Sequence, residues 1–326
     1  MNEDNHVLSN SPADRADAVK REAAMLGFDA CGIAAAEPID PDDRLGAWLA
    51  LGYQAGMDWM VASKAVRQDI RLRLPGAQSV VVVARNYYAE RPSPPPHSGR
   101  VSRYGWGRDY HRVLRKPLRR LARFLDSLEP EAESYGCIDS GPVLEKFWAA
   151  QAGIGWIGKN TLILRRGMGS YFFLAVLATT VKLVPDTPVS DGCGTCRACL
   201  DACPTGAIVT PYVLDSNRCI SYHTIENRDA IPDTVAEHMG DWVFGCDICQ
   251  DVCPWNRKVS ITDATDFHPR PHHANPPLDW FDRLTEEAFR EHFAGTPILR
   301  AKHAGMRRNA AIVRDNQPDA PSGNAG

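Results

Sequence analysis

The stretch Cys193-Gly-Thr-Cys196-Arg-Ala-Cys199-Leu-Asp-Ala-Cys203-Pro204 is the most informative part of this chain. Its spacing, C-x2-C-x2-C-x3-C-P, is typical of bacterial [4Fe–4S] sites. In that pattern three closely spaced thiolates bind one cluster, and the fourth thiolate binds a second cluster. The stretch therefore predicts two iron–sulfur clusters, which transfer electrons one at a time.

A second cysteine run, Cys246-x2-Cys249-x3-Cys253-Pro254, follows the same template but is one ligand short, because Val243 stands where the first cysteine belongs. Cys219 is the nearby thiol that has no other role, and it completes a set of eight ligands. The predicted ligands of one cluster are Cys193, Cys196, Cys199 and Cys253. Those of the other cluster are Cys203, Cys219, Cys246 and Cys249.

Two other uses of these cysteines were weighed. Disulfides need an oxidising compartment, and the polar N-terminus MNEDNHVLSN has no apolar region typical of a secretory signal. Zinc sites usually pair two C-x2-C motifs, whereas three cysteines at spacing three followed by Cys-Pro suit one tetrahedral ion poorly. Cys31 and Cys137 lie outside the runs, and we expect them to be buried as small hydrophobic residues.

Length and composition indicate a globular protein with room for two domains. The chain has 326 residues, of which 44% are hydrophobic and 24% charged, and its formal net charge is −3. The longest largely apolar stretch, residues 171–181, is too short to cross a bilayer and predicts a buried strand. We therefore expect no membrane association.

The chain divides into three segments. Residues 1–185 alternate helical and strand patterns, as in an α/β domain, and residues 186–262 hold the cysteine runs. Residues 263–326 predict a helical segment that ends in a polar tail, disordered from Asp315 onward. The clearest elements are helices over residues 14–26, 142–152 and 284–293 and strands over residues 79–84 and 171–180.

Positive charge is concentrated in one tract, although the whole chain is slightly acidic. Arg100 to Arg123 holds nine Lys or Arg residues and one acid, Asp109. After Tyr110, leucines and valines recur at helical spacing, so this part predicts an amphipathic helix with a basic outer face and Pro117 inside it. Such a face is either simply solvated or contacts a polyanion such as RNA. We favour RNA because Tyr104, Trp106 and Tyr110 are interleaved with the charges.

Two further motifs do not identify a ligand by themselves. Gly153-Ile-Gly155-Trp-Ile-Gly158-Lys-Asn160 matches G-x-G-x-x-G, but a helical pattern precedes it and a strand pattern follows, which is the wrong context for a dinucleotide site. It predicts a glycine-rich turn that brings backbone close to some other flat or bulky ligand. Asp139, in Ile-Asp-Ser-Gly-Pro, is on sequence pattern alone a turn or helix cap.

Taken together, the motifs resemble those of the epoxyqueuosine reductase family, which completes queuosine at the wobble position of tRNA. The resemblance runs from residue 15 to residue 310 and is carried by MDWM, VSRYGWGRDYH, IDSGPVLE, AGIGWIGKN, CGTCRACLDACPTGAI, RCISYHTIE and GCDICQDVCPWN. The combination is far more specific than the cysteine runs. It implies an enzyme that reduces epoxyqueuosine to queuosine using cobalamin and two [4Fe–4S] clusters.

The resemblance also implies the fold class, α+β. Residues 1–185 would form a nitroreductase-like α/β domain that binds cobalamin, and residues 186–262 a ferredoxin-like two-cluster domain. Residues 263–326 would be the beginning of a helical, HEAT-like region that longer members continue. Asp139 matches the family's proton donor. The positions that match its cobalamin contacts are Arg67, Ser102, Asp139, Ile163, Leu174, Ser221, Cys246 and Asp247.

The implied partners are the anticodon stem-loop of a tRNA and a low-potential electron donor such as ferredoxin or flavodoxin. We expect the basic tract and the segment Tyr222–Thr224 to face the RNA, and charge reversal at Arg115 and Arg119 to weaken a strongly salt-dependent affinity. A monomer in the cytoplasm is the expected form. The alternatives are a reductive-dehalogenase-like enzyme and a ferredoxin-type electron-transfer protein without chemistry of its own.

Overall fold

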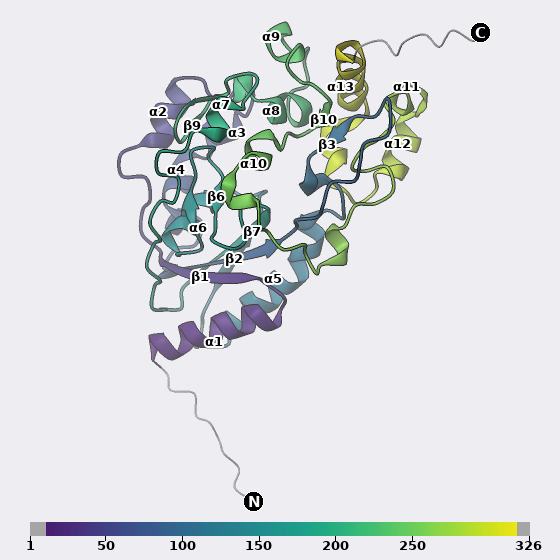
Figure 1. Cartoon of the computed structure of the whole chain (residues 1–326). Coiled ribbons are helices and arrows are strands. Elements are labelled where there is room, and N and C mark those ends of the chain that lie inside the picture. Colours follow the sequence, from purple (N-terminus) through teal and green to yellow (C-terminus); the bar gives the residue numbers. More distant parts are fainter. Residues whose placement is uncertain (1–10, 318–326) are drawn as a thin grey trace, which may run out of the picture.

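A four-stranded sheet forms the centre of the protein, as the computed structural model of residues 11–317 shows (Figure 1). The strands follow the order β1 (Ala30–Ala35), β2 (Ser79–Asn86), β7 (Phe172–Thr179), β4 (Ser134–Cys137), and every neighbouring pair is antiparallel. β2 and β7 are buried along almost their whole length. Their runs of valine, alanine and leucine suit strands that are covered on both faces.

Helices cover both faces of this sheet. α1 (Pro12–Met25) and α5 (Tyr110–Asp126) pack against one face together with Val81 and Val83, whereas α6 (Glu145–Gln151) packs against the other face with Val80 and Val82. Alternate residues of β2 thus enter two separate cores, as the two-residue period of a strand requires. Helices packed on an antiparallel sheet confirm the α+β class.

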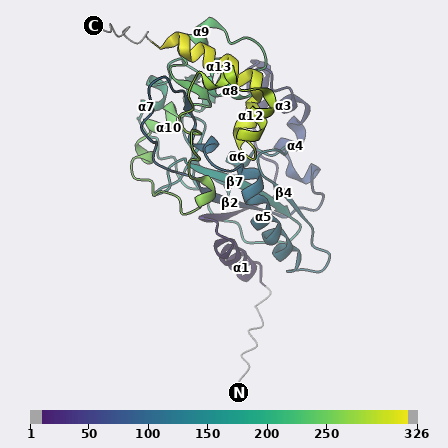
Figure 2. The ribbon, with the colours of Figure 1, turned by 90° about the vertical axis from the view of Figure 1, so that its right-hand side faces the viewer.

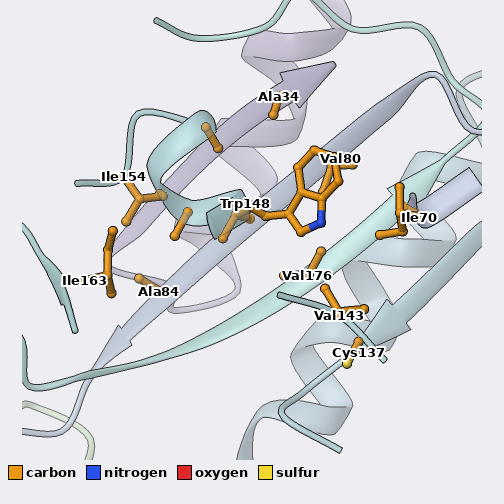
Figure 3. Close-up of a cluster of buried hydrophobic side chains, with 14 of the residues drawn as sticks. Ala34, Ile70, Val80, Ala84, Cys137, Val143, Trp148, Ile154, Ile163 and Val176 are labelled. Carbon is orange, nitrogen blue, oxygen red and sulfur yellow. The ribbon is translucent and has the colours of Figure 1, made fainter. Parts of the chain in front are cut away.

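Trp148 of α6 is the largest side chain of the core on its face of the sheet. It is 1% exposed and lies over β2 and β7 near Val80 and Val176, with Ile70 and Val143 beside it (Figure 3). The same core receives Cys137, so its expected burial is confirmed, while Cys31 is only partly buried. α6 is thereby tied to the sheet directly after the loop that carries Asp139.

A third core joins segments that are distant in sequence. β10 (Trp242–Phe244) pairs in parallel with β3 (Arg100–Val101), and α13 (Lys302–Asn316) packs on β10. Trp106, Trp242, Phe281, Phe293 and Met306 are buried together there. The C-terminal segment therefore shares a core with the cluster segment and the loop after β2. In Figures 1 and 2, α13 lies at the opposite end of the molecule from α1.

The other described elements are short. The helices are α2 (Arg44–Ala50), α3 (Trp59–Ala62), α4 (Lys64–Gln68), α7 (Ala198–Asp201), α8 (Ile220–Ile225), α9 (Asp233–Ala236), α10 (Ile248–Asp251), α11 (Trp280–Arg283) and α12 (Glu286–His292). The strands are β5 (Trp156–Ile157), β6 (Ile163–Leu164), β8 (Ile208–Thr210) and β9 (Val213–Leu214). The 3₁₀ turns are η1 (Ile70–Leu72), η2 (Arg103–Gly105), η3 (Ser216–Arg218), η4 (Pro254–Asn256), η5 (Thr265–Phe267) and η6 (Pro297–Ala301).

Several predicted boundaries are corrected. The helix expected over residues 142–152 begins at Glu145, because Asp139 to Leu144 form a turn. The helix expected over 284–293 is α12, which begins at its cap Thr285. α13 continues to Asn316, so a disordered tail does not begin at Asp315, and residues 318–326 lie outside the described residues. None of the described helices is long and apolar enough to cross a membrane.

Replacing Trp148 with alanine tests the importance of this core. Removing a buried aromatic ring leaves a cavity beneath the Asp139 turn, so we expect a loss of about 3–5 kcal/mol in the free energy of unfolding. Denaturant titration of the anaerobic protein measures it. Leu72→Ala, at an exposed apolar position, is the control and should change stability by less than about 0.5 kcal/mol. Similar losses in both variants would contradict the assignment of Trp148 to the core.

Candidate functional site

A cavity of about 420 Å³ lies between the edge of the sheet and the cysteine-rich segment. Its wall is mostly apolar, with β7 and the β6 region on one side and α8 and α10 on the other. Six of the eight residues expected to contact cobalamin line it. They are Ser102, Asp139, Ile163, Leu174, Ser221 and Cys246.

Four of the predicted cluster ligands form part of the same wall. They are Cys203, Cys219, Cys246 and Cys249. Burial raises the pKa of the Cys249 thiol, and the charges of Cys219, Asp247, Cys199 and Cys203 act on it in the same direction. The thiols assigned to this cluster from the sequence therefore lie near one another, next to the cavity.

The thiols assigned to the other cluster also lie together, away from the cavity wall. Burial raises the pKa of Cys199, with further increases from Cys253, Cys193 and Cys196. Within residues 11–317, no group of three or more His, Cys, Asp or Glu side chains is placed to hold a single metal ion. The donor set of each group is four thiols, which is the set that a [4Fe–4S] cluster requires.

Asp139 follows β4 at a turn whose backbone is left-handed, with φ of +56°. Its side chain is 64% exposed. The Tyr110 hydroxyl donates a hydrogen bond to Asp139 Oδ2, and His111 Nε2 lies 3.7 Å from the same oxygen. His111 Nδ1 is in turn 2.8 Å from Asp109 Oδ1. The Asp139 carboxylate therefore faces the Tyr110 hydroxyl and the His111 ring. The Asp109 carboxylate orients that ring from its other side.

An outer cavity of about 1010 Å³ adjoins the first one. Asp139, Tyr104 and Tyr110 line both cavities, so they form the boundary between them. Arg67 and Arg300 line the outer cavity only. Asp139 is thus placed where a buried cofactor on one side and an entering substrate on the other could both reach it.

Comparison with known proteins agrees with this arrangement. A family model described as "Epoxyqueuosine reductase QueG, DUF1730" matches residues 67–140, and a "4Fe-4S double cluster binding domain" matches residues 192–256. The epoxyqueuosine reductase of Synechocystis sp. is 48% identical and is matched over 86% of this chain and 98% of its own length. The chain belongs to the epoxyqueuosine reductase family.

More distant members and solved structures of the family extend the match. The Escherichia coli epoxyqueuosine reductase is 40% identical over 93% of this chain and 81% of its own length. A crystal structure of epoxyqueuosine reductase with an epoxyqueuosine-modified tRNA-Tyr stem loop has a TM-score of 0.86 at 33% identity, covering 92% of this chain and 80% of that one. The Bacillus subtilis enzyme, described with an aspartate-bearing catalytic loop swung out of its active site, has a TM-score of 0.86 at 32% identity over 92% and 81%.

Family membership confirms the class of chemistry predicted from the sequence. The chain is an oxidoreductase of epoxyqueuosine in tRNA, and residues 192–256 form its double [4Fe–4S] domain. The individual ligand and contact residues stay predictions.

Asp247 lies behind the cavity wall rather than on it. Its side chain is 0% exposed and is paired with Arg91 and Arg103, each 3.1 Å away, while Ser102 donates to its other oxygen. Burial raises the pKa of Asp247, and the two guanidinium groups oppose that shift. The carboxylate thus holds Ser102 and the η2 turn in place, and its oxygens are already occupied.

Arg67 acts on the same region from the other side. It is buried at the end of α4, where Nη1 donates to the carbonyl oxygen of Val143 at 3.0 Å and Nε to Ser63 Oγ at 2.9 Å. Val143 directly follows the Asp139 turn and Pro142. Arg67 is therefore placed to position that turn and to present a charge to the outer cavity.

The glycine-rich turn serves packing first. A side chain at Gly155 would collide with the carbonyl oxygen of Leu164, at 2.0 Å, and Gly153 has φ of +68°. Gly155 thus allows close approach of the chain to β6, whereas Gly153 makes a left-handed turn next to the carbonyl oxygen of Thr187. Only the end of the turn, Asn160 to Leu162, reaches the cavity wall, so the expected close approach to a ligand applies to that part alone.

One expected RNA contact is wrong. His223 and Thr224 of α8 are buried, at 5% and 1% exposure. His223 Nε2 is bonded to the Asn217 carbonyl oxygen, and Thr224 Oγ1 donates to the Ile220 carbonyl oxygen. Both side chains are turned inward, toward backbone of the cluster segment, so these two residues cannot face RNA. Tyr222 is only partly buried, and its contact with RNA stays a prediction.

The structure adds residues that sequence reasoning did not single out for the site. Tyr104, Tyr110, Glu145 and Lys146 line the inner cavity. The tyrosines lie within VSRYGWGRDYH, a stretch quoted for the family resemblance, so a signal for them was present. Arg300 reaches the outer cavity from the C-terminal segment and makes a two-oxygen ion pair with Glu226. Nothing in its local sequence indicated that position.

Glu145 is a half-buried carboxylate close to Asp139. Burial raises its pKa to about 7, and the charge of Asp139 adds to the shift. Cys137 Sγ donates to Glu145 Oε1 at 3.5 Å. Because the folded-state pKa exceeds the ordinary value of 4.5, folding is favoured most below pH 4.5, and this contribution is lost as the pH rises to about 7.

We therefore expect Glu145→Gln to flatten the dependence of stability on pH. Above pH 7 the variant should exceed the wild type in unfolding free energy by up to about 3 kcal/mol, and the difference should vanish toward pH 4.5. Thermal unfolding of both proteins between pH 4.5 and 8 measures it. Glu291→Gln, at an exposed glutamate, is the control. A difference that does not vary with pH would contradict the shift.

Proposed function

We propose that this chain reduces epoxyqueuosine to queuosine at the wobble position of tRNA, with Asp139 as the proton donor. The observation that carries this proposal is the position of Asp139 on the boundary of two cavities, one beside the cluster thiols and one lined by Arg67 and Arg300. The modified base would enter the outer cavity, and electrons would arrive from the inner side. The related B. subtilis enzyme has a catalytic loop with an aspartate, which supports the same role here.

Cobalamin is the cofactor proposed for the inner cavity. The lining of this cavity suits a large organic ring system. Aromatic and aliphatic side chains form most of its wall, and a few polar groups lie between them. Ile163, Leu174, Ser102, Ser221 and the Cys246 region would hold it, next to the thiols of one cluster. When bound, cobalamin supplies a low-potential, nucleophilic cobalt centre.

The protons are supplied by the chain itself. Converting an epoxide to an alkene consumes two electrons and two protons and releases water, and the two clusters can each store one of the electrons. Asp139 protonates the departing oxygen. The Tyr110 hydroxyl keeps the carboxyl group aimed into the site, and His111, held by Asp109, lies close enough to return a proton to Asp139 between turnovers.

Asp139→Asn tests this role. We expect turnover of epoxyqueuosine tRNA to fall by at least about 100-fold, since the amide cannot donate the proton, while RNA affinity and cluster absorbance stay unchanged. The measurement is anaerobic reaction followed by mass spectrometry of the digested nucleosides. Tyr110→Phe is the comparison variant and should retain part of the activity. Full turnover by Asp139→Asn would rule out the acid role.

RNA would lie along α5. Arg112, Arg115, Lys116, Arg119 and Arg120 recur at spacings of three and four, so they form one exposed stripe opposite the buried leucines of the helix. Among the described residues no ion pair joins any of these five to a carboxylate. Exposed arginines elsewhere in the chain are commonly paired, as Arg71 is with Asp69. Free positive charge in a stripe favours a polyanionic partner.

A protein electron donor would dock near Cys196. Of the ten cysteines, all within the described residues, Cys196 is the exposed one. Arg166 lies over the rings of Trp156 and Trp255, and Trp156 packs beside Cys193 and Cys253. Arg257 and Lys258, both exposed, follow Trp255 after one residue. A positive surface next to the outer cluster suits an acidic carrier such as ferredoxin or flavodoxin.

Arg166→Glu should separate docking from chemistry. We expect the KM for a ferredoxin or flavodoxin donor to rise by about 5- to 10-fold, because the charge complementarity at the docking surface is reduced. Turnover driven by dithionite should not change, because a small reductant needs no docking surface. An equal loss with both reductants would indicate cluster damage, and no change with either would move the docking site elsewhere.

The remaining expectations accompany the function. We propose that the protein works as a monomer in the cytoplasm, where its tRNA substrate is found. Residues 1–185 would bind the cofactor and residues 186–262 the clusters, while residues 263–326 complete the outer cavity through Arg300 and Thr296.

A further inference from the structure

A third cavity, of about 380 Å³, lies behind the Asp139 turn. It is bounded by α5 on one side and by β4 and the turn on the other. Arg115 and Arg119 come from the helix, and Ser134 and Tyr135 come from the strand. None of the residues assigned above to cofactor, clusters or proton transfer belongs to it, except His111 at its edge.

The chemistry of this cavity suits an anion. No aspartate or glutamate is among the described residues that line it, and Arg115 and Arg119 are exposed and have no carboxylate partner in the described part of the chain. A further guanidinium, that of Arg73, stacks on the Tyr135 ring at 4.1 Å. Guanidinium groups that no carboxylate neutralises are the preferred donors to phosphate oxygens.

Ser134 points to a ligand independently of these charges. Its hydroxyl oxygen is buried and has no hydrogen-bond partner within residues 11–317. A buried hydroxyl without a partner costs about 1–3 kcal/mol, so such groups are rare unless something else satisfies them. Ser134 lines the same cavity as the two arginines. An oxygen of a bound phosphate would accept its hydrogen bond.

The cavity shares its edge with the active site. His111, Ser140 and Gly141 line both this cavity and the outer cavity. The turn between them carries Asp139 in a left-handed conformation, which is unfavourable for a residue other than glycine. The hydrogen bonds within the turn are local, from the N–H of Ser140 to the Ile138 carbonyl and from the N–H of Val143 to the Gly141 carbonyl. A group bound in the cavity would contact the turn at Ser140 and Gly141, on the side away from the outer cavity's interior.

We propose that the Arg115–Arg119–Ser134 cavity binds a backbone phosphate of the substrate RNA next to the modified nucleotide, and that this contact holds the Asp139 turn in its catalytic position. The proposal rests on the proposed function and extends it. RNA would place its modified base in the site, and its phosphate would also hold the Asp139 turn in position. Arg112, one turn earlier on α5, lines the outer cavity, so a strand that leaves that cavity along the helix passes Arg115 and Arg119 next. Asp139 would then be firmly placed only when RNA is bound, which would limit proton delivery without substrate.

Two double variants on the same helix separate this contact from general attraction. Arg115→Ala with Arg119→Ala removes the cavity's guanidinium groups. Lys116→Ala with Arg120→Ala removes two charges from the same exposed stripe but none from the cavity. Both pairs should weaken RNA binding and lower its salt dependence by about one unit of slope per residue. Only the first pair should also lower kcat at saturating RNA, by about 10- to 100-fold, because the proton donor is misplaced.

Hydrogen exchange supplies a readout that does not depend on turnover. Unmodified anticodon stem-loop RNA, added at saturating concentration, should slow amide exchange in residues 134–143 of the wild type and of the Lys116/Arg120 variant. It should not do so in the Arg115/Arg119 variant. Ser134→Ala should give the same partial loss of protection without loss of thermal stability, since it removes a hydroxyl that has no protein partner.

The outcomes are distinct from those of the proposed function. If the wild type fails to reduce epoxyqueuosine RNA, the proposed function is wrong, whatever the exchange shows. If the wild type is active but both double variants lose the same affinity and keep the same kcat, or if RNA protects residues 134–143 equally in all proteins, the phosphate contact is wrong. Loss of kcat and of protection in the Arg115/Arg119 variant alone is the expected result.

Discussion

The buried ion pairs of Asp247 with Arg91 and Arg103 are the interaction on which the geometry of the site depends. A carboxylate with no exposed surface is costly, and here it is balanced by Arg91 and Arg103 and by the Ser102 hydroxyl. Arg103 also reaches Asp251 and the Tyr171 hydroxyl. The network thus joins α10, which contains Cys249, to the loop after β3 and to the residue before β7. An unpaired charge in the interior would be strongly destabilising, so these ion pairs fix the position of the cluster segment relative to the sheet domain.

That position creates the inner cavity. The sheet contributes Leu174 and Phe172, and the cluster segment contributes Cys246 and Ile248 across from them. The C-terminal segment then closes the outer cavity, since its core is continuous with β10 and with Trp106. Asp139 lies at the meeting point because Arg67 and the Trp148 core hold the backbone on its C-terminal side. The two cavities and Asp139 between them are thus formed by three segments that are far apart in the sequence.

The turn that bears Asp139 is held less firmly than the elements around it. Its neighbours β4 and α6 are fixed by the sheet and by Trp148, whereas the turn itself has a strained φ and few hydrogen bonds. The conformation of such a segment can change when a ligand binds on either side of it. Cavities lie on both sides of it, one with apolar walls for a cofactor and one with arginines. The proposed proton donor therefore lies on an adjustable segment beside a cavity with more firmly held walls.

Much of this was readable from the chain. The cysteine spacing predicted two [4Fe–4S] clusters, and the double-cluster domain matched over residues 192–256 confirms this, while the grouping of the individual ligands stays a prediction. A run of valines determined β2, a largely apolar run determined β7, and the spacing of leucines determined the buried face of α5. The family resemblance singled out Asp139 and five other residues that prove to lie on the cavity wall. Only the tertiary structure decided that Asp247 is a buried counter-ion, that His223 and Thr224 are inside, and that Arg300 reaches the outer cavity. Local spacing records which faces of an element are apolar, but the partner of a polar side chain lies in a distant segment and is settled only when the cores pack.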